Sequence, residues 1–152
     1  MDAILLFSHG SVLCGAERNL LERAARMRAR GDARIVEVGF LNYTEPEFLA
    51  AVGRCVAQGA TRIVVAPYFL VSGKFVVDEL PAKIAEARER HPSVDFVTAD
   101  VIGFHPALAD AILASADSAR APHEWRGEAQ HAAEHCREHP KCPLYRSEVC
   151  RA

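Results

Sequence analysis

The chain has 152 residues, long enough for one domain with a hydrophobic core. A formal net charge of −2 at pH 7 gives the protein no electrostatic reason to bind nucleic acid. No apolar run approaches the roughly 20 residues that span a bilayer, and residues 1–7 lack the basic start of a signal peptide. We therefore expect a cytoplasmic protein without nucleic-acid or membrane partners.

Strand and helix patterns alternate along most of the chain. Short apolar runs bounded by polar residues or glycine indicate buried strands, and apolar residues at helical spacing between proline and glycine signals indicate helices. We expect strands over residues 3–7, 34–41, 62–70 and 94–99, and helices over 16–30, 44–59, 81–90 and from 106. This alternation predicts an α/β fold with a parallel four-stranded sheet flanked by helices.

Some local features of the helices make specific predictions. Thr44 and Glu47 have the spacing of a capping box, with Pro46 suited to the first helical turn. Cys55 falls on the apolar stripe of that helix and is expected in the core. In the last helix, the residues expected to face the core are Leu108, Ile112 and Leu113.

In parallel sheets of this kind, ligands bind beyond the carboxyl ends of the strands. The segments that follow the expected strands should therefore meet at one rim: residues 8–11, 42–45, 71–75 and 103–105. His9 lies at the first strand end and precedes Gly10, which is expected to let a ligand approach the backbone closely. A neutral imidazole can bind a divalent metal or accept a proton near neutral pH, and the alternative is a structural histidine.

Five short motifs follow one another along the chain: Ser8-His9-Gly10-Ser11, residues 40–46 ending in Glu45-Pro46, residues 59–70 ending in Pro67-Tyr68-Phe69-Leu70, Gly73 with Leu80-Pro81, and Gly103-Phe104-His105-Pro106. In order and spacing they resemble the sirohydrochlorin chelatase family of the short CbiX/SirB type, over roughly residues 2–118. The resemblance implies a chelatase-like fold with a wide cleft for a planar, carboxylate-rich tetrapyrrole. It also implies a cobalto- or ferrochelatase (a lyase) that inserts divalent cobalt, iron or nickel in cobalamin or siroheme biosynthesis.

The resemblance further implies that His9 binds the metal and helps to remove the pyrrole protons. Glu45 is the second catalytic candidate, and its alternative role is to favour the helix N-terminus. For Lys74 the alternative to pairing with a ligand carboxylate is a solvated lysine, and for His105 it is a cap at a helix start. A homodimer is implied as well, because larger chelatases resemble two such domains fused. The residues expected to bind the tetrapyrrole are Ser11, Tyr68, Ser72, Lys74, Phe75 and His105.

Three positions depart from the family pattern. Phe75 stands where the family usually has its second metal-binding histidine, Asn42 where an acid often follows the second strand, and Glu79 where a helix-start aspartate is usual. A site with two imidazoles is therefore not expected. Cys14, in the loop after His9, is a candidate thiolate ligand of the metal, and the alternative is a small residue packed at the helix start.

The composition changes at about residue 121, which divides the chain into a chelatase-like domain over 1–120 and a Cys/His-rich C-terminal extension over 121–152. The extension is too poor in apolar residues to form its own core, and a polar helix is expected over 128–138. Its cysteines can hold zinc or an iron–sulfur cluster, and the alternative is a tail with incidental cysteines. The candidate ligands are Cys136, Cys142 and Cys150, with His131, His135 and His139 nearby.

Two other classes of function fit the same residues. A non-catalytic protein would hold a tetrapyrrole or a metal, the missing second imidazole having removed turnover. An iron–sulfur or zinc protein would use the chelatase-like domain as a scaffold for the metal site in the extension. Metal insertion into sirohydrochlorin separates the chelatase from both.

Overall fold

The chain folds as alternating strands and helices in a computed structural model that describes residues 1–103, 105–121, 124, 136, 138–146 and 150. Each strand and helix expected before residue 121 is present. The single π-helical turn η1 leads directly into α3, so that helical segment begins earlier than expected. In chain order the elements are β1 (Asp2–Ser8), α1 (Arg18–Arg30), β2 (Ile35–Phe40), α2 (Phe48–Ala57), β3 (Arg62–Pro67), η1 (Phe75–Glu79), α3 (Leu80–Arg90), β4 (Asp95–Thr98) and α4 (Ala107–Asp117).

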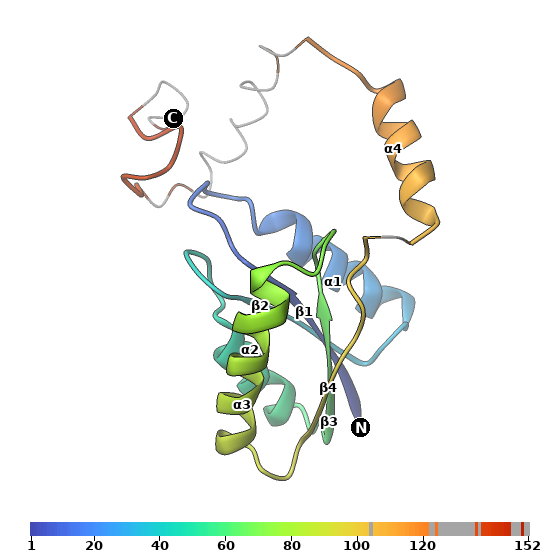
Figure 1. Cartoon of the computed structure of the whole chain (residues 1–152), viewed down its shortest axis with the longest axis vertical. Coiled ribbons are helices and arrows are strands. Elements are labelled where there is room, and N and C mark those ends of the chain that lie inside the picture. The colour runs from blue at the N-terminus through green and yellow to red at the C-terminus, as the bar shows by residue number, and fades with distance from the viewer. Residues whose placement is uncertain (104, 122–123, 125–135, 137, 147–149, 151–152) are drawn as a thin grey trace.

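The four strands form one parallel sheet, as the alternation predicted, and their order in the sheet is β2-β1-β3-β4. The central strand β1 pairs with β2 from Ala3 opposite Ile35 to Ser8 opposite Phe40. Because all strands run in the same direction, their carboxyl ends lie at one edge, the upper end of the sheet in Figure 1. This edge is the rim, where the loops that follow the strands come together.

Helices cover both faces of the sheet (Figure 1). On one face, α2 and α3 pack against alternate side chains of β1 and β3, and Phe7 and Phe48 are fully buried there. On the other face, Leu20 and Ala24 of α1 pack against β2. Cys55 lies in the first of these cores, as predicted, and burial raises the pKa of its thiol to about 12.

The last helix, α4, contradicts the prediction that Leu108, Ile112 and Leu113 face the core. None of its described residues is buried, and the exposed fractions of Ile112 and Leu113 are 67% and 65%. In Figure 1, α4 stands beyond the rim, away from the sheet. The chain passes the rim before the helix begins, so no sheet surface lies beneath it. The apolar periodicity identified the helix correctly, but it cannot show whether a partner for the apolar stripe lies in the same chain.

The start of α2 also differs from the expected capping box. Glu47 is itself the N-cap residue, no side chain caps the helix, and the Glu45–Pro46 peptide bond is cis. Thr44 is buried, and its hydroxyl accepts the N–H of Ser11 at 2.9 Å and donates to the Ser11 carbonyl oxygen at 3.2 Å. The Thr44 hydroxyl therefore joins two loops of the rim and does not cap α2.

No helix in the described part of the chain has the length and apolar character needed to cross a lipid bilayer.

Candidate active site at the rim of the sheet

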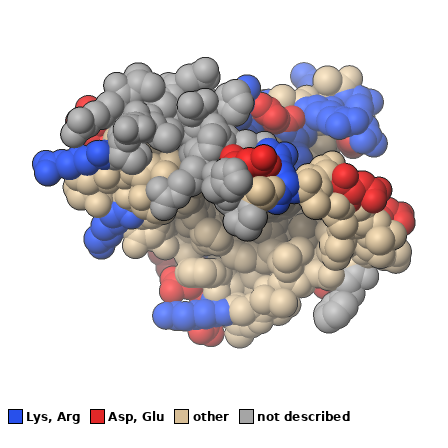
Figure 2. All heavy atoms as spheres, turned by 90° about the horizontal axis from the view of Figure 1, so that it is seen from above, with Lys and Arg blue, Asp and Glu red and all other residues tan. Residues whose placement is uncertain are grey.

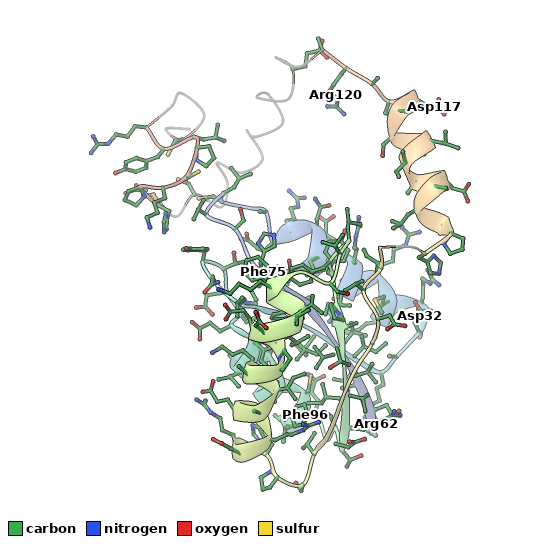
Figure 3. All side chains as sticks on the ribbon, viewed as in Figure 1. Asp32, Arg62, Phe75, Phe96, Asp117 and Arg120 are labelled. Carbon is green, nitrogen blue, oxygen red and sulfur yellow. The ribbon has the colours of Figure 1, made fainter. Side chains whose placement is uncertain are left out.

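His9 lies exposed at the rim, directly after β1, as predicted. Its ring packs against Phe69, which follows β3, and against Phe75, the first residue of η1, with centroid distances of 5.9 and 5.7 Å. The rings of Phe69 and Phe75 lie 6.1 Å apart, so the three residues form an aromatic triangle. Figure 3 shows Phe75 at the end of its helical segment nearer the rim, whereas Phe96 lies well below it.

The aromatic triangle constrains the imidazole of His9. Tilted ring contacts of this kind contribute about 0.5–1.5 kcal/mol each beyond the area that they bury. They restrict the orientation of the imidazole ring while its two nitrogens remain the only polar atoms of the three rings. The arrangement therefore presents one metal-binding or proton-accepting group next to apolar surface on which a planar ligand can pack.

Gly10 shapes the loop after His9. Its φ is +82°, and a Cβ atom at this position would lie 1.8 Å from the carbonyl oxygen of Asn42. The space that a side chain at Gly10 would occupy is therefore filled by the loop after β2, while Gly10 also lines the hollow beside His9. Glycine is required because the two loops touch, as the hydrogen bond from the Asn42 N–H to the His9 carbonyl at 3.0 Å confirms.

A hollow of about 260 Å³ opens beside His9. Ser11, one of the expected ligand-binding residues, lines it, although the Ser11 hydroxyl also accepts the N–H of Leu13 at 3.0 Å. Glu17, the residue before α1, lines it too, and sequence reasoning did not single it out. Nothing in the local pattern distinguishes Glu17 from the other acidic residues of the chain, because only the folded loop turns its side chain inward. The lining residues are Ser8, His9, Gly10, Ser11, Ala16, Glu17, Phe40 and Thr44.

A larger open hollow of about 780 Å³ lies between the loops that follow β3 and β4. Two residues expected to bind the tetrapyrrole, Ser72 and His105, line it. His105 also accepts the N–H of Ala107 on its Nδ1 atom at 3.2 Å, which is the helix-start role weighed as its alternative. The volume lies in the range of small-molecule sites, which are mostly apolar. The apolar residues of the lining are Leu70, Val71, Val101, Ile102 and Pro106.

Two further expected ligand-binding residues carry or contact positive charge. The hydroxyl of Tyr68 accepts a hydrogen bond from Nε of Arg23 at 3.3 Å, and the Arg23 guanidinium lies 5.8 Å from the Tyr68 ring centroid. Lys74 forms an exposed ion pair with Glu79 at 3.7 Å. Figure 2, which views the molecule from above, shows an uncharged region below the centre of this face, with Lys, Arg, Asp and Glu side chains toward its outer edges.

Glu45, expected as the second catalytic group, does not line the hollow beside His9. Its Oε2 atom accepts the N–H of Glu47 at 3.1 Å. This contact matches the alternative interpretation, in which the carboxylate stabilises the start of α2.

The cysteine candidates are grouped differently from the expectation. Cys14 is buried and does not line the hollow beside His9. In the extension, the sulfur atoms of Cys136 and Cys150 lie 3.6 Å apart. The pKa of the Cys136 thiol is raised: a hydrogen bond from the Glu138 N–H lowers it, but the contact with Cys150, burial, and the charges of Cys150 and Cys14 together outweigh that effect. Cys14 is therefore close enough to Cys136 to influence its ionisation.

The extension lies against the rim at one further point, where the rings of Tyr43 and His139 meet edge to face at 6.1 Å. Among the described residues, no three His, Cys, Asp or Glu side chains are grouped closely enough to hold a metal ion. His131, His135 and nearly all of the polar helix expected over 128–138 lie outside the described residues.

Comparison with known proteins agrees with this fold. The model of the CbiX family matches residues 3–119. The sirohydrochlorin cobaltochelatase of Methanocaldococcus jannaschii is 33% identical over 91 residues, covering 60% of this chain and 64% of that protein. A sirohydrochlorin cobaltochelatase of Priestia megaterium is 37% identical over 106 residues, covering 69% of this chain and 34% of that protein. The matches thus span less than two thirds of the length of these relatives.

Solved structures show the same architecture. The sirohydrochlorin chelatase SirB from Bacillus subtilis subspecies spizizenii, in complex with cobalt, superposes with a TM-score of 0.71 at 25% identity, covering 88% of this chain and 60% of that one. SirB from Bacillus subtilis with Fe3+ superposes with a TM-score of 0.68 at 28% identity, covering 74% and 45%. The family match over residues 3–119, together with a four-stranded parallel sheet that these chelatases share, establishes that this chain belongs to the CbiX family.

Proposed function

We propose that this protein inserts a divalent metal ion (cobalt, iron or nickel) into sirohydrochlorin or a related tetrapyrrole. The observation that carries the proposal is the position of His9, an imidazole held by two aromatic rings at the rim of a chelatase fold. Relatives named sirohydrochlorin cobaltochelatase and ferrochelatase support it, as do the structures of SirB in complex with cobalt and with Fe3+.

The chemistry of metallation explains why one exposed histidine suits this place. Two pyrrole N–H protons must leave while a partly desolvated metal ion reaches the ring nitrogens. A neutral imidazole nitrogen can first share its lone pair with the metal and, as the metal passes to the macrocycle, accept one of the two protons, while the other passes to water. Both tasks need an accessible nitrogen next to the face of the ligand, as at His9.

Substrate binding in this proposal uses the surface around His9. The macrocycle packs on Phe75 and the apolar lining of the larger hollow, and its carboxylates meet the charged edge of the rim. Lys74 and the Arg23–Tyr68 pair are the groups that carry or contact positive charge there. Ser11, Ser72 and His105 complete the set with hydrogen-bonding groups at the two hollows.

The test is an anaerobic insertion assay with sirohydrochlorin and Co²⁺, Fe²⁺ or Ni²⁺, followed by the absorption of the macrocycle. We expect His9→Ala to lower kcat by about 100-fold or more, in the range for losing a proton-transfer group. His91→Ala is the matched control, because His91 ends α3 next to the loop that enters β4 and is expected to leave the rate unchanged. A wild-type rate in His9→Ala would remove His9 from the mechanism. Tight tetrapyrrole binding with no insertion by the wild-type protein would favour the non-catalytic binder.

A second candidate function is metal binding by the extension, favoured by the distance between the Cys136 and Cys150 sulfurs. Two thiolates on a tetrahedral zinc ion, each at about 2.3 Å, lie roughly 3.8 Å apart, and these sulfurs are 3.6 Å apart. The ion would be zinc or the iron of an iron–sulfur cluster. We expect Cys136→Ser and Cys150→Ser to lose metal that the anaerobically purified protein retains. Loss in Cys142→Ser as well would extend the site to all three cysteines expected from the sequence.

We also propose that the protein acts as a homodimer. The match covers 34% and 42% of two Priestia megaterium chelatases, so a second copy would supply a comparable second domain. The exposed apolar residues Ile112 and Leu113 of α4 offer a face for it. Sedimentation of the wild-type chain and of Ile112→Glu tests this, with a dimer expected only for the former. The cytoplasm is the proposed compartment, because thiol ligands such as those proposed at Cys136 and Cys150 persist in a reducing environment.

A further inference from the structure

The hollow beside His9 contains a carboxyl group with no assigned task. Glu17 lines this hollow, and its Oε2 atom is buried with no hydrogen-bond partner. Throughout the described part of the chain it is the one buried side-chain nitrogen or oxygen atom in that condition. Leaving such an atom unsatisfied costs about 1–3 kcal/mol, and more when it is charged. A bound ligand that pairs with the Glu17 oxygen atom would remove this free-energy cost.

The loop before α1 explains how Glu17 reaches the hollow. Gly15 adopts a φ of +76°, and the N–H of Arg18 donates to the Gly15 carbonyl at 3.1 Å, which turns the chain sharply into the helix. Glu17 occupies the N-cap position of α1, yet its side chain makes no capping hydrogen bond. A carboxylate at this position ordinarily accepts the free N–H groups of the first turn. Here Glu17 lines the same hollow as His9, and its Oε2 atom is buried.

Three other polar side chains near His9, those of Thr44, Ser11 and Glu45, are already engaged. The hydroxyl of Thr44 exchanges hydrogen bonds with the Ser11 backbone, and the hydroxyl of Ser11 accepts the Leu13 N–H. Glu45 accepts the Glu47 N–H and lies outside the hollow. Of the residues that line the hollow, His9 and Glu17 are the titratable ones, and Glu17 offers an oxygen atom without a partner.

We propose that Glu17 is the second protein ligand of the metal ion held by His9, one carboxylate oxygen beside one imidazole nitrogen. This inference rests on the proposed function, in which the metal ion is a substrate. Divalent cobalt, iron and nickel accept mixed nitrogen and oxygen ligands. Glu17 thereby supplies a second metal-binding atom, which the side chain of Phe75 cannot provide.

Two protein ligands suit an ion that must be passed on. Resident structural sites usually close around a metal with four ligands, and the described residues hold no cluster of three. A site of one imidazole and one carboxylate leaves the remaining coordination positions to water, which the macrocycle nitrogens can replace. The carboxylate also lowers the cost of holding a divalent cation in a partly buried hollow.

The test is a Co²⁺ titration of the full-length chain without any macrocycle, read by visible absorption and by calorimetry. The background is Cys136→Ser/Cys150→Ser, so that thiols of the extension do not contribute. We expect Glu17→Gln and His9→Ala each to raise the Kd for Co²⁺ at least 10-fold. We expect the double variant to lose no more Co²⁺ affinity than either single variant. The matched control is Glu22→Gln, an exposed carboxylate of the same helix paired with Arg18 at 2.7 Å, which should leave the Kd unchanged.

The outcomes separate this inference from the proposed function. A Kd for Glu17→Gln equal to that of the background would overturn the ligand role, even if the wild-type protein inserts metal. Glu17-dependent Co²⁺ binding in a protein that inserts no metal would overturn only the chelatase. If Glu17→Gln melts at a lower temperature, Glu17→Asp provides the second measurement: it keeps the charge, and a ligand role predicts that it recovers part of the lost affinity.

Discussion

The part of the molecule that ends with β4 and the part that follows it differ sharply in how they bury apolar surface. The first part, residues 2–98, forms two cores on the two faces of its sheet, with Phe48 among the fully buried side chains. In the second part, α4 buries none of its described residues although its apolar residues repeat at helical spacing. The difference indicates that the first part buries its own apolar surface, whereas none of the residues that the structure describes covers the apolar residues of α4.

The candidate site follows the same division. His9, Glu17 and Phe75 all come from loops and turns that the sheet and its three helices position directly. The second part contributes His105 and Pro106 to the larger hollow, at the base of α4. We infer that the first part supplies the proposed metal ligands and that the second part contributes to the surface proposed to hold the macrocycle.

The largest expected effect tests this division directly. Phe48→Ala should lower the free energy of unfolding by about 3–5 kcal/mol, because it removes a buried ring that packs edge to face on Phe7 at 5.6 Å. Ile112→Ala should change it by no more than about 0.5 kcal/mol, as is usual for exposed positions. Urea unfolding at protein concentrations too low for dimers measures both. Equal losses would show that α4 has a partner within the chain after all.

The second prediction contrasts the buried Cys55 with the partly buried Cys136. Burial raises the pKa of the Cys55 thiol from 9.0 to about 12. Between these two pH values the folded protein keeps the thiol proton, whereas the unfolded chain has lost it. The stability from this group is fully present below pH 9 and is lost as the pH rises toward 12. The loss is up to about 1.4 kcal/mol for each pH unit. Urea unfolding from pH 8 to 11 measures it.

Cys55→Ala is the control, since it lacks the thiol and should lose this component of the pH dependence while the contribution of other groups remains. A thiol reagent gives a second measurement of the same contrast. At neutral pH it should modify Cys136, which is only partly buried, in the folded protein, whereas Cys55 should react only after unfolding. Rapid native-state modification of Cys55 would contradict the closed core of the first part.

Much of the first part was predictable, because alternating apolar runs report directly what each strand and helix buries. The parallel direction of the strands and the rim position of His9 followed from general rules for parallel sheets, whereas the strand order was not predicted. The contacts within the rim did not follow, since they depend on how loops fold against one another. Neither the Asn42 carbonyl beside Gly10 nor the buried carboxylate of Glu17 leaves a periodic pattern in the sequence. The exposure of α4 was not predicted for another reason. Helical periodicity identifies an apolar face of a helix, but it does not show which residues pack on that face.

The prediction with the smallest expected effect tests whether the first part alone can hold a metal ion between two imidazoles. The Phe75 and His9 ring centroids are 5.7 Å apart, and two imidazoles on one ion, with nitrogens at about 2.1 Å, have centroids roughly 5 Å apart. Phe75→His should therefore lower the Kd for Co²⁺ about 10-fold, or about 1.4 kcal/mol, in the Cys136→Ser/Cys150→Ser background. Phe75→Leu is the control, because it removes the ring without adding a donor and should not tighten binding. If Phe75→His binds Co²⁺ no more tightly than Phe75→Leu, these two loops do not supply a paired site, and the partner of α4 becomes the place to look for further ligands.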